Sequence, residues 1–174
     1  MLQIMIEQNT CRAFLGFGGN LGKPLNNFRR ARQQLAKQPE IEVISASPLY
    51  QTPPVGGPEG QPDYLNGVVE ILTGLSVLDL LQLCQQIEAD AGRSRNLHWG
   101  ARTLDIDLLL VDDLIMDVPL LTLPHPRLHQ RHFVLLPLND LAPEQLHPLL
   151  NTTINQLLRA LPPAVGITRL NEIW

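Results

Sequence analysis

The sequence contains few cysteines and no long apolar segment. Only Cys11 and Cys84 are present, which excludes a disulfide framework and a cysteine-based metal site and favours a reducing compartment. No apolar run approaches the roughly 20 residues of a membrane span, and the first ten residues lack the basic start and apolar stretch of a secretory signal. These absences predict a cytoplasmic protein that does not associate with membranes.

Positive charge is also scarce. The net charge is −4 and the pI about 5.7, so the chain lacks the broad basic field that nucleic-acid binding needs. Of the 13 basic residues only Lys23 and Lys37 are lysines, and the arginines suit planar, bidentate contacts with phosphate or carboxylate groups. Any anion-binding site must therefore be local.

Length and composition allow one compact domain. A chain of 174 residues, 44% of them hydrophobic, can bury a single sizeable core, and no repeat or long linker divides it. We expect residues 1–11 to be an N-terminal extension and residues 12–174 to form one domain that works as a monomer.

Apolar periodicity predicts the order of the elements. Strands are expected at 12–18, 41–50, 64–73 and 103–111, with helices at 24–38 and 76–92. A short return segment at 114–116 and two C-terminal helices, at 129–141 and 153–161, follow. The order strand, helix, strand, strand, helix, strand is that of an α+β, ferredoxin-like fold (βαββαβ). Such a fold has an antiparallel sheet with both helices on one face and the other face free.

The segment from Thr52 to Pro62 is rich in proline and glycine. It is too long and too stiff for a hairpin turn, and long loops in compact domains are often functional. This segment is therefore a candidate binding loop.

Two aspartates begin the last of the predicted strands. Alternation sends one set of residues to the core, Leu104, Ile106, Leu108 and Leu110, and another to the free face, Asp105, Asp107, Leu109 and Val111. Carboxylates two residues apart on a strand can share hard cations such as Mg²⁺. Taken alone, the pair could equally be two solvated acids.

Three arginines, Arg93, Arg95 and Arg102, stand just before these aspartates. Exposed salt bridges would be an ordinary explanation and would contribute little energy. Guanidinium groups beside carboxylates spaced for magnesium are also what a nucleoside triphosphate needs. The chain has no phosphate-loop motif, so a Walker-type nucleotide site is excluded. The pattern favours a magnesium-dependent transfer of a phosphorus-containing group.

Residues 92–95 (Gly-Arg-Ser-Arg) and 99–107 (Trp-Gly-Ala-Arg-Thr-Leu-Asp-Ile-Asp) closely resemble the signature of the 6-hydroxymethyl-7,8-dihydropterin pyrophosphokinases, enzymes of folate biosynthesis. Further resemblances follow in order between about Ala13 and Leu161, at residues 18–21, 50–54, 62–66, 124–125, 131 and 133. The resemblance implies a ferredoxin-like fold and the transfer of pyrophosphate from ATP to the hydroxymethyl group of the dihydropterin, with release of AMP.

The resemblance also implies roles for individual residues. Asp105 and Asp107 would hold two magnesium ions, and Arg93 and Arg102 would contact the ATP phosphates. The ATP side would further comprise Gln85, Glu88, Arg95, Ile106, Thr122, His125 and Arg131. The pterin would be held by Thr52, Pro53, Pro54, Val55, Tyr64, Asn66, Trp99 and Phe133.

The sequence leaves three other interpretations open. His125, His129 and His132 could form a transition-metal site, although no cysteine or carboxylate completes a convincing tetrahedral set. A ferredoxin-like sheet could bind RNA, but the free face would then need aromatic and basic residues where Asp105 and Asp107 stand. A D-x-D nucleotidyl or glycosyl transferase would share the magnesium and release a different product.

Overall fold

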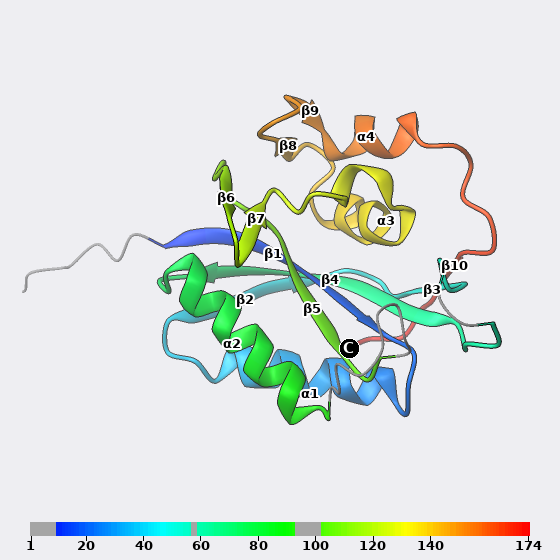
Figure 1. The fold of residues 1–174 in the computed structure, drawn as a ribbon, viewed down its shortest axis with the longest axis horizontal. Helices are drawn as coiled ribbons and strands as arrows, with labels where there is room; N and C mark the ends of the chain where they lie inside the picture. The colour runs from blue at the N-terminus through cyan, green and yellow to red at the C-terminus, as the bar shows by residue number, and fades with distance from the viewer. Residues whose placement is uncertain (1–9, 57–58, 93–101) are drawn as a thin grey trace, which may run out of the picture.

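The computed structural model describes residues 10–56, 59–92 and 102–174 (Figure 1). The strands are β1 (Cys11–Gly19), β2 (Ile41–Ala46), β3 (Tyr50–Thr52), β4 (Tyr64–Thr73), β5 (Asp105–Val111), β6 (Met116–Val118), β7 (Leu121–Leu123), β8 (Leu146–His147), β9 (Thr152–Thr153) and β10 (Thr168–Arg169). The helices are α1 (Pro24–Ala36), α2 (Val77–Asp90), α3 (His132–Leu141) and α4 (Ile154–Ala160), with a 3₁₀ turn η1 (Leu128–Gln130) before α3.

The main sheet confirms the predicted ferredoxin-like arrangement. Strand β1 pairs with β4 on one side and with β5 on the other, both antiparallel, and β2 and β3 pair with β4. The two βαβ units are thus interleaved, with β1 and β4 at the centre of the sheet. Asp105 and Asp107, the predicted metal-binding residues, lie on the edge strand β5 directly beside β1.

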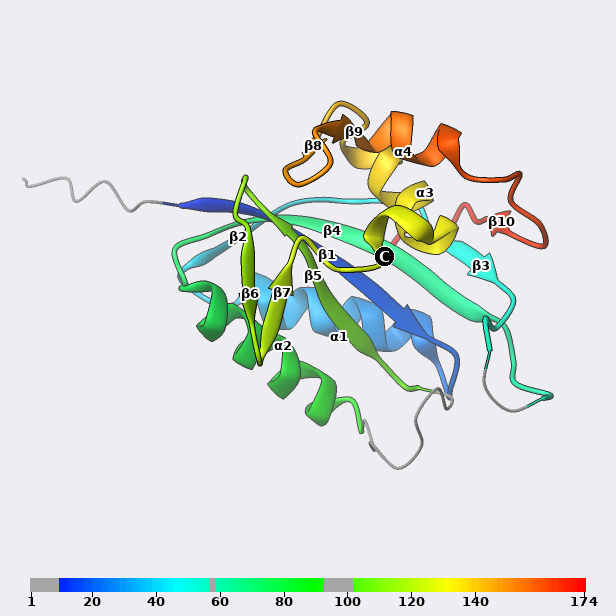
Figure 2. The same cartoon turned by 45° about the horizontal axis from the view of Figure 1, so that its top comes forward.

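Helices α1 and α2 cover one face of this sheet (Figure 2). Helix α1 begins with Pro24, whose fixed φ suits the first turn, and it buries Phe28, Ala31 and Leu35 at helical spacing. At the start of α2, the hydroxyl of Ser76 accepts a hydrogen bond from the backbone amide of Asp79 and caps the helix. Both helices bury their apolar sides against the sheet and form the larger hydrophobic core.

The opposite face is only half free, which corrects the prediction that it would be open. Helices α3 and α4 cover one part of it, on the side away from α1 and α2 (Figure 2). Sheet residues Phe14, Val68, Leu109 and Leu110 pack there against α3 and α4 in a second apolar cluster. The sequence did show two helices beyond the core, but their apolar sides need a partner, and this half of the sheet provides it.

The predicted strand 41–50 is wrong as one continuous element. It is divided into β2 and β3 by the segment 47–49, because Pro48 has no amide hydrogen to donate to the sheet. Ser47 keeps the contact with β4, since its amide donates to the carbonyl of Val68 and its hydroxyl accepts from the Val68 amide, each at 2.9 Å. The chain can therefore bend without leaving the sheet.

Alternation along β5 also fails beyond Leu108. The register between β1 and β5 shifts between Phe14 and Leu15. As a result Leu109 and Leu110 both belong to the second apolar cluster, beneath α3 and α4, and Val111 belongs to the main core. A β-bulge of this kind reverses the faces of all later residues. The predicted faces of Asp105 and Asp107, which precede the shift, are unaffected.

The remaining short elements were not predicted in this form. The return segment expected at 114–116 is the hairpin β6–β7, and the helix expected at 129–141 is η1 followed by α3. Strand β10 pairs with β3 at the sheet edge, and β8 pairs with β9. Within the described residues, no helix is long and apolar enough to cross a membrane.

Candidate active site

A row of three residues crosses the sheet beside the half that α3 covers. Gly18 of β1 lies opposite Asn66 of β4 and opposite Asp105 of β5, and one step further along, Gly16 lies opposite Asp107. Residues directly opposite in a sheet share a face. Phe14, two positions before Gly16, is buried beneath α3, whereas both glycines remain partly accessible. On the open part of this face, the Asn66 amide therefore lies on one side of β1, and the carboxylates of Asp105 and Asp107 lie on the other.

Arg102 forms an ion pair with Asp105 through Nη1 and Oδ2. Asn20 holds the backbone of Arg102 at both of its polar groups. The side-chain Oδ1 of Asn20 accepts from the Arg102 backbone amide at 2.8 Å, and the backbone amide of Asn20 donates to the Arg102 carbonyl at 2.9 Å. Asn27 of α1 donates to the carbonyl of Thr103 at 3.0 Å. The backbones of Gly19 and Thr103 lie so close together that a Cβ on Gly19 would be only 2.8 Å from the Thr103 carbonyl oxygen. The turn after β1 therefore fixes the entry to β5 and with it the Arg102 backbone.

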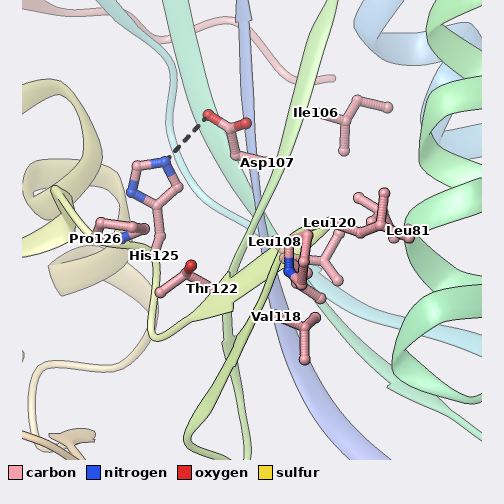
Figure 3. Close-up of a pocket in the computed structure, with 11 residues that line it drawn as sticks. Leu81, Ile106, Asp107, Leu108, Val118, Leu120, Thr122, His125 and Pro126 are labelled. Carbon is pink, nitrogen blue, oxygen red and sulfur yellow. Dashed lines mark ion pairs between the residues drawn. The ribbon is translucent and has the colours of Figure 1, made fainter.

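Asp107 lies near His125, with 3.8 Å between Oδ2 and Nε2 (dashed line in Figure 3). This contact is ionic only when the imidazole is protonated. Burial and the positive charges of Arg131 and Arg127 lower the pKa of His125 to about 4, against the opposing effect of Asp105. At neutral pH the imidazole is therefore uncharged, and the contact with Asp107 is not an ion pair.

Glu88 of α2 supports the strand between the two aspartates. Its carboxylate is buried, with 2% of the residue exposed, and Oε1 accepts from the backbone amide of Ile106 at 2.6 Å. A charge-assisted bond of this kind is stronger than a neutral one. Glu88 thus fixes the backbone from which Asp105 and Asp107 project.

A pocket of about 270 Å³ adjoins Asp107 (Figure 3). Its walls come from α2, β5, the β6–β7 hairpin and the segment at 125–126. The predicted ATP-side residues Ile106, Thr122 and His125 all line it. Leu81 and residues 118–121 also line the pocket. They could not be predicted as lining residues, because their position depends on how the hairpin folds back over β5.

The residues predicted to hold the pterin begin on β3 and β4. Thr52 and Asn66 are both buried, and the Asn66 amide nitrogen donates to the Thr52 hydroxyl oxygen at 2.8 Å. Tyr64, which lies opposite Thr52, has its pKa raised by burial and by Asp105 and lowered by Arg102. The net effect raises the pKa of Tyr64, and the influence of Arg102 and Asp105 shows that this tyrosine lies within electrostatic range of the pair.

The other described residues predicted to hold the pterin lie on the loop after β3 and on α3. Pro53, Pro54 and Val55 follow β3, and Val55 is 67% exposed. Phe133 in the first turn of α3 packs against the second apolar cluster, and the Arg131 guanidinium lies 5.4 Å from the centroid of the Phe133 ring. Burial and Arg127 lower the pKa of Arg131, while Asp107 and Asp105 act in the opposite direction. Arg131 is thus within electrostatic range of both carboxylates.

Four predicted site residues need separate mention. Arg93, Arg95 and Trp99 lie outside the described residues. Gln85 is exposed on α2.

Comparison with known proteins identifies the family. The sequence model described as 7,8-dihydro-6-hydroxymethylpterin-pyrophosphokinase (HPPK) matches residues 14–143. The chain belongs to the HPPK family. It is 42% identical over 159 residues to the 2-amino-4-hydroxy-6-hydroxymethyldihydropteridine pyrophosphokinase of Pseudomonas aeruginosa, covering 91% of this chain and 96% of that protein. It is also 42% identical over 146 residues to the enzyme of that name from Synechocystis, covering 84% of this chain and 74% of that one.

Solved structures show the same HPPK fold. The HPPK-DHPS of Plasmodium falciparum, as a triple mutant with STZ-DHP, superimposes with a TM-score of 0.68 at 17% identity. The match covers 86% of this chain and 43% of the Plasmodium chain. The likeness to the HPPK part of a longer protein supports the ferredoxin-like topology described above.

The carboxylates fit the protein part of a magnesium site. Asp105 and Asp107 share one face of β5, and their side chains are 20% and 47% exposed. Among the described residues no group of three or more His, Cys, Asp or Glu side chains is placed to hold a metal. Mg²⁺ is commonly bound by one or two carboxylates together with substrate phosphates and water, so two suffice in a nucleotide site. His132 instead contacts the Pro162 carbonyl at 2.7 Å, which leaves the three-histidine alternative without support.

Proposed function

We infer that this protein transfers pyrophosphate from ATP to the hydroxymethyl group of 6-hydroxymethyl-7,8-dihydropterin in folate biosynthesis, releasing AMP. Membership of the HPPK family supports the reaction. The main support for the proposed site is the row Asn66, Gly18, Asp105. In this row the Asn66 amide, which can hydrogen-bond a pterin edge, lies across β1 from the Asp105 carboxylate, which can bind a metal.

On the donor side we propose that Asp105 and Asp107 hold two Mg²⁺ ions. When bound, magnesium would neutralise phosphate charge and lower the pKa of the attacking hydroxyl. Arg102, fixed through its backbone by Asn20, then has its guanidinium beside Asp105 and can turn to the phosphate oxygens. The triphosphate would run from Asp107 toward the pocket lined by Ile106, Thr122 and His125. Glu88 would contribute by holding the Ile106 backbone.

Arg131 and His125 add different chemistry to the donor side. Arg131 carries a positive charge toward both aspartates and can receive negative charge that develops on transfer. His125 is neutral near pH 7, so it can hydrogen-bond a ligand without adding charge. Arg93 and Arg95 are proposed as further phosphate contacts from the sequence resemblance alone.

On the acceptor side we propose that Asn66 reads the pterin edge. Its amide nitrogen is already bonded to Thr52, which fixes the orientation of the side chain and leaves the amide oxygen as an acceptor. Tyr64, Phe133 and Trp99 would contact the ring faces, and residues 52–55 would add backbone groups. Fixing the acceptor hydroxyl in line with the phosphorus would account for a large part of the rate.

The product assay tests this function directly. Purified protein with Mg²⁺, ATP and 6-hydroxymethyl-7,8-dihydropterin should yield AMP and the pterin pyrophosphate in equal amounts. ADP as the sole nucleotide product would falsify the assignment, and loss of activity in EDTA that Mg²⁺ restores would support the metal requirement.

Asp105→Ala tests the proposed metal site. Turnover should fall at least 1,000-fold, on the order of what removing a central electrostatic group costs. The free energy of unfolding should change by about 1 kcal/mol or less, because the Arg102–Asp105 pair is partly exposed. Asp113→Ala, in the exposed turn after β5, is the control and should retain wild-type turnover. Wild-type turnover of Asp105→Ala would remove the metal assignment.

We also propose that one copy of the chain is sufficient. The described residues of both substrate sides come from a single chain, so a monomer can form the site. Light scattering coupled to size exclusion, with activity measured across the eluted peak, checks this.

A further inference from the structure

Gly18 stands at the middle of the active-site row and carries no side chain. It pairs with Asn66 on one strand and with Asp105 on the other. Because neighbouring strands lie about 4.8 Å apart, the backbones of Asn66 and Asp105 are separated by roughly 10 Å across it. Any molecule that touches Asn66 and presents an atom to a metal at Asp105 must pass over β1 at this point.

The fold itself does not require a glycine at this position. A Cβ added to Gly18 would have only one heavy atom within 4 Å among the described residues, Oδ1 of Asn66 at 3.5 Å, which is ordinary van der Waals contact. The backbone of Gly18 is regular strand and is not among the residues with positive φ. A glycine inside a strand lowers stability relative to alanine, so its presence without a packing reason needs another explanation.

Neighbouring glycines show what a packing reason looks like. A Cβ on Gly19 would lie 2.8 Å from the carbonyl oxygen of Thr103, and one on Gly67 would lie 2.6 Å from the ring of Trp174. A Cβ on Gly16 would press on Leu109 at 3.2 Å. In each of these cases protein atoms occupy the space. At Gly18 none of the described residues except Asn66 comes within 4 Å of that position.

The one atom near that space is a ligand-binding group. The Asn66 nitrogen donates to Thr52, so Oδ1 is the end of the amide that faces Gly18. A methyl group at position 18 would stand between this acceptor and a ligand that approaches along the row. Carbon atoms in contact sit about 3.5–4.0 Å apart, so the methyl would displace such a ligand by on the order of an ångström.

We propose that Gly18 is a specificity-determining residue, whose bare Cα lets the acceptor pass directly from the Asn66 amide to the metal-binding carboxylates. This inference rests on the proposed function. Without a side chain at position 18, the acceptor can lie close enough to β1 for its hydroxyl group, and not only its ring, to reach the phosphorus atom.

Gly18→Ala is the test. We expect the variant to fold with an unchanged or slightly raised Tm, and to bind a non-hydrolysable Mg·ATP analogue within about twofold of wild type. Its kcat/KM for the dihydropterin should fall about 100-fold, as expected when a reacting group is misplaced by an ångström. The Kd for the fluorescent oxidised pterin, 6-hydroxymethylpterin, should rise at least tenfold. Gly18→Ser, which is larger, should be worse in the same two measurements.

Gly74→Ala is the matched control, because a Cβ there would meet only Glu40 at 3.9 Å and the position lies at the far end of β4. It should match wild type in all measurements. Wild-type kcat/KM for Gly18→Ala would overturn the proposal while leaving the reaction intact. A large fall in Tm would also overturn it, because protein atoms would then need the space. If wild-type protein makes no AMP, the proposed function fails, and the assignment to Gly18 fails with it.

Discussion

The indole nitrogen of Trp174 donates a 2.7 Å hydrogen bond to the backbone carbonyl of Ser47. Its ring lies edge-on to Phe17, with centroids 5.2 Å apart, and also contacts Phe28, and only 3% of the residue is exposed. Position 67 can only be glycine here, since a Cβ would overlap the indole. Trp174 therefore fills the core beneath the break between β2 and β3, next to Asn66 of the acceptor side.

Replacing Trp174 by alanine should lower the free energy of unfolding by about 3–5 kcal/mol, because the change leaves a large cavity and an unpaired carbonyl at Ser47. Urea unfolding followed by circular dichroism measures the loss. Ile173→Ala, at a position 83% exposed, should change stability by no more than about 0.5 kcal/mol. Equal effects of the two variants would contradict the buried position of the indole.

The Tyr50–Asp140 contact should make stability depend on pH in alkali. The Tyr50 phenol donates to Asp140 at 2.6 Å, and burial together with that contact raises the pKa of Tyr50 from 10 to about 12. Between pH 10 and 12 the folded protein holds a proton that the unfolded chain has released. The stability that this contact contributes should therefore be complete below pH 10 and be lost as the pH rises to 12. Tyr50→Phe should lose about 1–2 kcal/mol at pH 8 and show a shallower slope, since the buried Cys84 thiol, whose pKa is also raised, keeps its own share of the alkaline loss.

Asp140→Asn is the control for this dependence. It keeps a hydrogen-bond acceptor for the phenol but removes the negative charge that helps to raise the pKa of Tyr50. Its alkaline loss of stability should begin near pH 10 and end before pH 12. Denaturant unfolding at a series of pH values checks both variants, and a wild-type curve that is flat from pH 10 to 12 would count against the contact.

Glu88 should affect metal dependence without touching the metal. Glu88→Ala leaves the buried Ile106 amide without its acceptor, which should cost about 1–3 kcal/mol of stability. The Mg²⁺ concentration for half-maximal activity should rise about tenfold, because residues that orient metal ligands commonly have effects of this size. Glu88→Gln keeps an oxygen for the amide and should be milder in both respects. An unchanged Mg²⁺ dependence in Glu88→Ala would show that the Ile106 backbone is held by other contacts.

Cys84 should resist thiol reagents in the folded protein. It is fully buried in α2, and burial, with the nearby charges of Glu88 and Asp107, raises the pKa of its thiol to about 12. In a Cys11→Ser variant, which leaves only this thiol, a chromogenic disulfide reagent at pH 8 should react slowly in native buffer and completely in guanidinium chloride. Rapid reaction of the native variant would show that α2 opens readily.

Much of the framework could be predicted because its signals are local. The strand at 64–73 and the helix that starts after Ser76 agree with the structure, since strand alternation and helix capping depend on nearby residues. The faces of Asp105 and Asp107 follow from the same two-residue period. The family resemblance then supplied the acceptor and the transferred group, which the alternation of two aspartates could not.

Longer-range features were decided only by tertiary packing. The bulge at Leu109 arises where two strands distant in sequence must match, and the coverage of half the sheet by α3 and α4 depends on which apolar faces meet. Periodicity along one strand contains no information on either. The same limit explains why Glu88, predicted on the ATP side, is also a buried support for Ile106.

The sequence by itself determined the element order, the aspartate pair on one strand face and the family. Only the tertiary structure decided that Asn66 and Asp105, 39 positions apart in the numbering, lie on one row with Gly18 between them. Strand register is set by the whole sheet, because a one-residue slip would send these side chains to the opposite face. The chemistry is therefore present in the residues, and the sheet register brings it together.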